Sequence, residues 1–124
     1  MQEMEKVFGV VADYFAVLSG PTRLKILHAL CDGELTVGRI VETTGSNQAN
    51  ISQQLSLMFR AGVLARRKEG NQVYYWVSDP KVVEICRFVC VLVASRMDER
   101  EVAPDALGTF MATGAGKRAR KARQ

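Results

Sequence analysis

The stretch "SNQANISQQLSLMFRAG", residues 46–62, has the apolar spacing of a helix, but amides and hydroxyls fill its first half. A solvated surface helix would normally carry Lys and Glu at such positions. At about 100° per residue, Ile51, Leu55 and Met58 fall within about 60° of arc and are predicted to face a core. The opposite side then holds Ala49, Gln53, Ser56 and Arg60, with Asn50 and Ser52 on its flanks.

This uncharged polar face has the chemistry of a helix that enters a DNA major groove. Amides pair with base edges, and hydroxyls and cations contact phosphates. We therefore predict base contacts from the first half of the helix and a phosphate contact near its end. The predicted contact residues of this helix are Gln48, Asn50, Ser52, Gln53, Ser56 and Arg60.

A β-hairpin is predicted directly after this helix, with strands near 63–68 and 72–77 around Gly70-Asn71. Its first strand carries Arg66, Arg67 and Lys68, which with Asn71 form a basic finger suited to phosphates or the neighbouring minor groove. Polar residues that merely cap a helix, or a lone basic hairpin, would be unremarkable. Their combination at this spacing indicates nucleic-acid binding.

The rest of the chain is predicted to be helical. Helices are expected at about 3–18, from Pro21 until Gly33, after a Thr36 cap until Gly45, and from about Pro80 toward Glu101 behind an Asp79 cap. The core face of the second is expected to consist of Leu24, Ile26, Leu27 and Leu30. Four helices, a hairpin and a last helix make a mainly α fold, a winged helix-turn-helix.

Length and charge indicate one domain with a basic tail. The 124 residues suffice for one core, which we place in residues 1–102, followed by a flexible tail over 103–124. Five Lys/Arg in "KRARKARQ" account for more than the net charge of +4 and leave −1 for the remainder. Such a tail attracts polyanions, although a merely solubilising or non-native end is an equal alternative. No secretory signal or membrane-length apolar run is apparent, so we expect a cytoplasmic protein.

The segments "LSGPTRLKILHAL", "GELTVGRI" and "NISQQLSLMFRAGVLARRKEGNQVYYWV" resemble the ArsR/SmtB family of winged-helix transcriptional repressors over about residues 5–100. The most specific match, "ISQQLSLMFRAGVL", places Ser52, Leu55, Ala61 and Gly62 at family positions. Gln54 stands where the family commonly has His, a departure that bears on operator preference. The resemblance implies a homodimer through the first and last helices that occupies a two-fold-symmetric operator of double-stranded DNA and leaves it when an inducer acts.

Two inducer sites typical of the family are absent from this sequence. The cysteine positions of the arsenic and cadmium-type site read Thr36 and Gly38, and the sole histidine, His28, is not on the last helix, where the zinc-type site lies. We interpret His28 as a helix-packing residue that titrates near neutral pH.

Three cysteines are the remaining candidates for sensing. Cys86 and Cys90 are four residues apart on the last helix and share a face, while Cys31 ends the second helix. Together they suit a thiolate-bound soft ion such as As(III) or Sb(III), or a reaction with persulfide or oxidant. The alternative is packing, because the arc of Cys86 and Cys90 also holds Val82, Val89, Val93 and Met97.

The sequence contains no phosphate-cradling glycine loop, nucleophile-base pair or histidine cluster, so we predict a protein that is not an enzyme and requires no cofactor. Two alternatives to an inducible repressor stay open. One is a winged-helix module that uses the same polar face to contact a protein. The other is a repressor without cysteine-based sensing.

Overall fold

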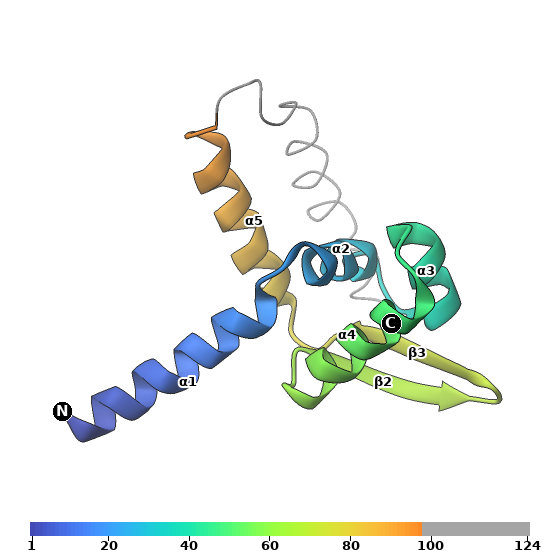
Figure 1. The fold of residues 1–124 in the computed structure, drawn as a ribbon, viewed down its shortest axis with the longest axis horizontal. Coiled ribbons are helices and arrows are strands. Elements are labelled where there is room, and N and C mark those ends of the chain that lie inside the picture. Colours follow the sequence, from blue (N-terminus) through green and yellow to red (C-terminus); the bar gives the residue numbers. More distant parts are fainter. Residues whose placement is uncertain (98–124) are drawn as a thin grey trace.

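The computed structural model describes residues 1–97 and has the predicted winged helix-turn-helix architecture (Figure 1). In chain order its elements are α1 (Gln2–Leu18), α2 (Pro21–Leu30), β1 (Leu35–Thr36), α3 (Val37–Thr44), α4 (Gln48–Arg60), β2 (Leu64–Glu69), β3 (Gln72–Val77) and α5 (Pro80–Ala94). Within the described residues no helix is both long and apolar enough to cross a membrane. The expected domain boundary at 102 and the basic tail lie outside the described residues.

Side-chain caps define the tight turn between α3 and α4. Thr36 Oγ1 accepts a hydrogen bond from the Arg39 amide at 3.2 Å and starts α3. Gly45 ends that helix with a φ of 70°, a left-handed conformation that glycine adopts at little cost. Asn47 Oδ1 then accepts from the Asn50 amide at 2.8 Å and starts α4. The local sequence therefore determines where α4 begins.

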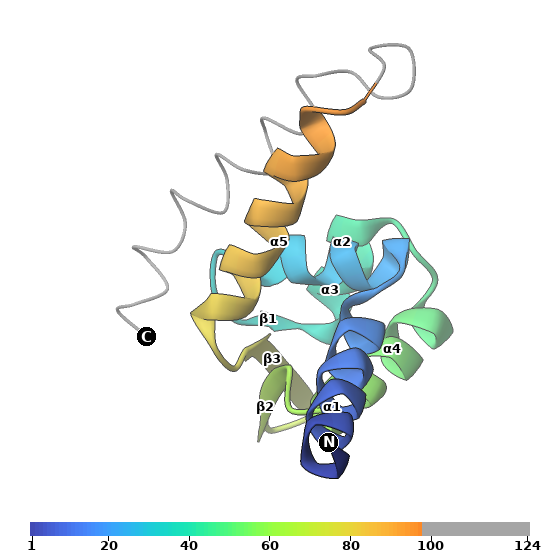
Figure 2. The same cartoon turned by 90° about the vertical axis from the view of Figure 1, so that its left-hand side faces the viewer.

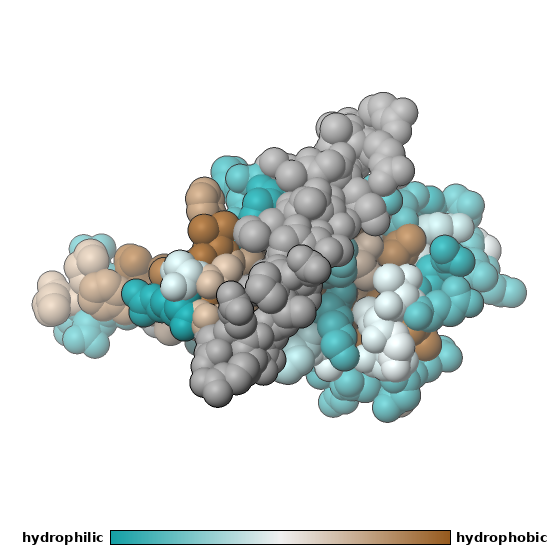
Figure 3. Space-filling view, turned by 90° about the horizontal axis from the view of Figure 1, so that it is seen from above, coloured by the Kyte–Doolittle hydropathy of each residue, from teal (hydrophilic) through white to brown (hydrophobic). Residues whose placement is uncertain are grey.

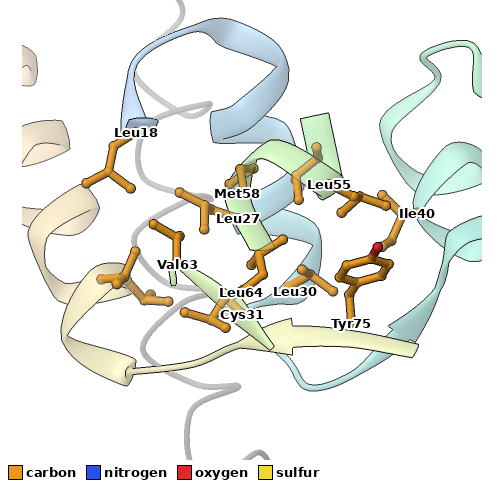
Figure 4. Close-up of a cluster of buried hydrophobic side chains, with 14 of the residues drawn as sticks. Leu18, Leu27, Leu30, Cys31, Ile40, Leu55, Met58, Val63, Leu64 and Tyr75 are labelled. Carbon is orange, nitrogen blue, oxygen red and sulfur yellow. The ribbon is translucent and has the colours of Figure 1, made fainter. Parts of the chain in front are cut away.

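A single core joins α2, α3, α4 and the sheet (Figure 4). Its fully buried side chains include Ile26, Leu27, Leu30, Ile40, Ile51, Leu55 and Met58. The prediction that Leu24 belongs to this core is wrong, because its side chain is 41% exposed. On a helical wheel Leu24 lies roughly 110° from the centre of the buried α2 stripe, beyond the arc that the core covers.

The wing is part of a three-stranded antiparallel sheet with the order β1-β3-β2. Strand β1 was not predicted; it pairs Leu35 with Tyr75 and Thr36 with Tyr74. Two residues are too short to show an alternating pattern, and only their pairing with β3 makes them a strand. The expected turn is present, with Gly70 at a φ of 62° between the paired residues Glu69 and Gln72.

Helices α1 and α5 extend from this core as two arms (Figures 1 and 2). The last described helix ends at Ala94, whereas the sequence predicted that it would run toward Glu101. Ser95 Oγ donates to the Leu92 carbonyl at 2.8 Å, a local bond of the kind that competes with helix continuation.

Arg67 anchors the wing to the segment that precedes β1. Its Nη2 and Nε donate to the two carboxylate oxygens of Glu34 at 2.7 and 3.2 Å, and its Nη1 donates to Glu69 at 2.7 Å. The guanidinium also lies 4.3 Å from the centre of the Tyr74 ring. The hydrogen bond from Arg67 lowers the pKa of Glu34, and the two carboxylates raise the pKa of Arg67. This forked pair ties β2 to the start of β1.

We predict that Glu34→Gln lowers the free energy of unfolding at pH 7, because it removes the negative partner of Arg67. The pKa of Glu34 is lower in the folded state, so its stabilisation is present above the unfolded value of about 4.3 and is lost as pH falls through the folded value. Urea unfolding between about pH 7 and 3 should show the difference from the natural protein shrinking toward zero in acid.

The matched control is Glu42→Gln, which removes an ion pair with Arg39 whose two side chains are 68% and 69% exposed. This control should change stability little at any pH. An equal effect of both variants would show that the Glu34 pair does not anchor the wing.

Candidate nucleic-acid interface

Helix α4 turns its amide-rich side away from the core, as predicted. Ile51, Leu55 and Met58 are 0% exposed on the inner side. On the outer side Gln48, Ser52, Gln53 and Arg60 are exposed, and Asn50 and Ser56 are half-buried. The burial of one stripe therefore presents short polar side chains in the first half of α4 and a cation at its end.

Gln54 faces α2 instead of solvent, and its partner Arg23 was not anticipated as a site residue. Arg23 Nε donates to Gln54 Oε1 at 2.8 Å, and Gln54 Nε2 donates to Asn50 Oδ1 at 3.4 Å. Arg23 and Gln54 are both half-buried. No sequence spacing relates residues 31 positions apart, so only the packing of α2 against α4 reveals this contact.

The basic residues of the predicted finger lie on both faces of β2. Successive strand residues point to opposite faces, so Arg67 is separated from Arg66 and Lys68. Arg66 pairs across the ladder with the buried Tyr75, whereas Arg67 pairs with Tyr74. The phosphate-facing capacity of Arg67 is reduced by its bonds to two carboxylates.

Arg66 is the wing cation that lies against α4. Its guanidinium carbon is 3.9 Å from the centre of the Phe59 ring, and its Nη1 donates to the Tyr75 hydroxyl at 3.2 Å. This stacking places a positive charge beside the C-terminal half of α4. Lys68 is exposed on the same face of β2, and Asn71 is exposed at the tip of the wing, which extends away from the helices (Figure 1).

The three cysteines occupy different environments. Cys31 and Cys86 are 2% and 6% exposed and belong to the core, whereas Cys90 is half-buried one turn along α5. Burial raises the pKa of Cys86, with a smaller contribution from Cys90, and burial also raises the pKa of Cys90. Both groups are therefore protonated thiols at neutral pH, the less nucleophilic form.

The expected three-thiolate site is not formed within one protomer. Across residues 1–97 no three His, Cys, Asp or Glu side chains lie close enough together to hold a metal ion. Cys31 is the C-cap residue of α2, and Cys86 lies within α5. The position of each thiol is therefore set by the packing of a different helix. His28, expected to pack between helices, is half-buried on α2.

Similar solved structures share this fold. The crystal structure of Rv0081 from Mycobacterium tuberculosis has a TM-score of 0.67 and 30% identity, covering 77% of this chain and 97% of that one. The transcriptional repressor BigR from Xylella fastidiosa has a TM-score of 0.65 and 28% identity, covering 73% and 93%. The homodimeric winged helix-turn-helix DNA-binding domain of Mb0332 from Mycobacterium bovis has a TM-score of 0.67 and 28% identity, covering 75% and 86%.

The sequence comparisons agree with the fold. The pattern described as "Bacterial regulatory protein, arsR family" matches residues 20–65, which run from the start of α2 into β2. The HTH-type transcriptional regulator Rv0081 of Mycobacterium tuberculosis is 31% identical over 99 residues, covering 79% of this chain and 87% of its own length. The chain therefore belongs to the ArsR family of bacterial regulatory proteins, which are DNA-binding transcriptional regulators and not enzymes.

Proposed function

We propose that the protein is a cytoplasmic transcriptional repressor that binds a two-fold-symmetric operator as a homodimer. The observation that carries this proposal is the outer face of α4, where uncharged polar side chains are exposed beside the cations of the wing. A major groove accepts such a helix, and its base edges offer donors and acceptors to amides. The repressor BigR shares the same architecture.

The apolar surfaces of α1 and α5 support the dimer. In α1 only Leu18 is buried, and most of its large apolar side chains are exposed in the isolated chain. Figure 3 shows brown hydrophobic residues along the α1 arm. Exposed apolar side chains on α5 include Ile85, Phe88, Val89, Val91, Leu92 and Val93. A helix with so little tertiary burial is marginal by itself, and a second copy would cover both surfaces.

We propose a division of DNA contacts that the exposure of these residues supports. Gln48, Asn50, Ser52 and Gln53 are assigned to bases, and Ser56 lies on the same face of α4. Arg60, Arg66, Lys68 and Asn71 are assigned to the DNA backbone. Arg67 supports the wing through Glu34, and its contribution to DNA is mainly to hold β2 in place.

Binding to the region upstream of the protein's own gene tests the proposal. Gln53→Ala should relax base preference by about 1–3 kcal/mol at one operator position, because an exposed amide that reads a base edge is lost. Lys68→Ala should weaken specific and random duplexes alike and lower the slope of log affinity against log salt by about 1. Gel-shift titrations over a range of salt measure both effects.

Random DNA of the same length is the control for both variants. If the natural protein shows no salt-sensitive, sequence-selective binding, the polar face serves a protein partner and the alternative of an interaction module is favoured. If Gln53→Ala and Lys68→Ala lose affinity evenly on both duplexes, the division into base and backbone contacts is wrong.

The finer part of the proposal concerns release from DNA. We propose that a thiol-reactive or thiophilic inducer acts at Cys86 and Cys90, with Cys31 as a further thiol, and that it is As(III), Sb(III), persulfide or an oxidant. Cys90 is the more accessible of the α5 pair, and its sulfur is near enough to Cys86 to raise the pKa of that thiol. Reaction at Cys86 would disturb the core that packs α5 against α2.

Substitution of each α5 thiol tests this mechanism. Cys90→Ser and Cys86→Ala should keep operator affinity within about twofold and abolish release by arsenite or by persulfide, because each removes one sulfur of the pair. Alanine is chosen for Cys86 because a hydroxyl would be buried in an apolar site. Alkylation of both thiols in the natural protein should keep accelerating as pH rises past the ordinary thiol value of about 9.0, since their pKa values are raised.

Cys31→Ala is the matched variant for the third thiol. Loss of release in this variant would include Cys31 in the sensing site. If release by arsenite and by persulfide is unchanged in all three variants, the cysteines only pack in the core, and the repressor has no cysteine-based sensing.

A further inference from the structure

A hydrogen-bonded chain connects the end of α1 to the polar face of α4. It begins at the carbonyl oxygens of Ala16 and Ser19, which accept from Arg23 Nη1 at 2.8 and 3.3 Å. It continues through Gln54 and ends at Asn50 Oδ1. Arg23 thus satisfies carbonyls at the C-terminus of α1 and holds an α4 side chain at the same time.

The direction of every hydrogen bond in this chain follows from its first member. A guanidinium only donates, so the Gln54 amide must turn its oxygen toward Arg23. The Gln54 NH2 group then points to Asn50, whose oxygen accepts. Asn50 is left with its Nδ2 group as the part that can donate outward. The arginine therefore determines the orientation of an amide two links away.

We propose that Arg23 is a positioning residue for sequence recognition, which acts through Gln54 to present the NH2 group of Asn50 to an acceptor in the DNA groove. This inference rests on the proposed function. The acceptor atoms available in the major groove are N7 and O6 of guanine, N7 of adenine and O4 of thymine. An unheld Asn50 would sample both amide orientations and discriminate these edges less well.

Arg23 is suited to this role by its burial. It is half-buried on α2 and donates to two carbonyls and an amide, so most of its donors are directed into the protein. A phosphate-binding arginine would keep its charge exposed and would weaken specific and random DNA equally when removed. Lys25, an exposed cation on the same helix, provides that comparison.

The first test compares Arg23→Ala with Lys25→Ala, which removes the same charge from α2. Arg23→Ala should lower operator affinity about tenfold, the size of one weakened base contact, and should change affinity for random DNA no more than Lys25→Ala does. The double variant Arg23→Ala/Asn50→Ala should bind the operator as tightly as Asn50→Ala alone does. The reason is that the two single substitutions act on the same DNA contact.

The second test uses Gln54→Glu, which separates positioning from helix packing. The carboxylate still accepts from Arg23 and so keeps the tie between α2 and α4, but it has no NH2 group to donate to Asn50. Unfolding by urea should therefore be little changed, while the ratio of operator to random-DNA affinity should fall about as far as in Arg23→Ala. The added negative charge of Glu weakens binding to operator and random DNA alike, so its effect cancels in the ratio of the two affinities.

NMR of the DNA-free protein makes the outcome independent of the proposed function. The side-chain amide signals of Asn50 should shift in Arg23→Ala and in Gln54→Glu and stay in place in Lys25→Ala. Unshifted Asn50 signals, additive losses in the double variant, or full selectivity in Gln54→Glu would overturn the positioning role. Failure of the natural protein to select any operator would instead contradict the proposed repressor, with the Asn50 signals still deciding whether Arg23 positions that amide.

Discussion

The burial of one apolar stripe of α4 is the constraint on which the proposed DNA-facing surface depends. Ile51, Leu55 and Met58 are fully enclosed, and each such side chain contributes roughly 1.5–3 kcal/mol when removed from water. A rotation of α4 about its axis would expose part of this stripe and bury amides without partners. The orientation of Gln48, Ser52 and Gln53 toward solvent is therefore a consequence of the core, as is the half-buried position of Asn50.

Cations around α4 fall into two groups. Arg23 and Arg67 direct their donors to protein oxygens and hold α4 and the wing in place. Arg60 and Lys68 are exposed, and Arg66 combines exposure with stacking on Phe59. A guanidinium that is already bonded to a carboxylate is a weaker partner for phosphate than an exposed one, so the number of basic residues overstates the charge that DNA would meet.

The arms and the thiols link assembly to sensing in the proposed mechanism. Both α1 and α5 expose apolar surfaces that a second copy would cover. Cys86 lies where α5 joins the core, and Cys90 lies one turn further along the same helix. Chemistry at these sulfurs would therefore act on the element that sets the distance between two recognition helices, a distance that must match the repeat of B-form DNA.

The sequence by itself determined the order of the helices and of the two hairpin strands and most of their bounds, because caps such as Thr36, Asn47 and Asp79 and turns such as Gly45 act through near neighbours. It also determined the face of α4 that is buried, because helical periodicity is local. Tertiary structure alone decided the exposure of Leu24, the strand β1, the separation of Arg67 from its neighbours and the contact of Arg23 with Gln54. These features arise when residues distant in the sequence meet, and hydrogen bonds and ion pairs between such residues leave no periodic signal in the chain.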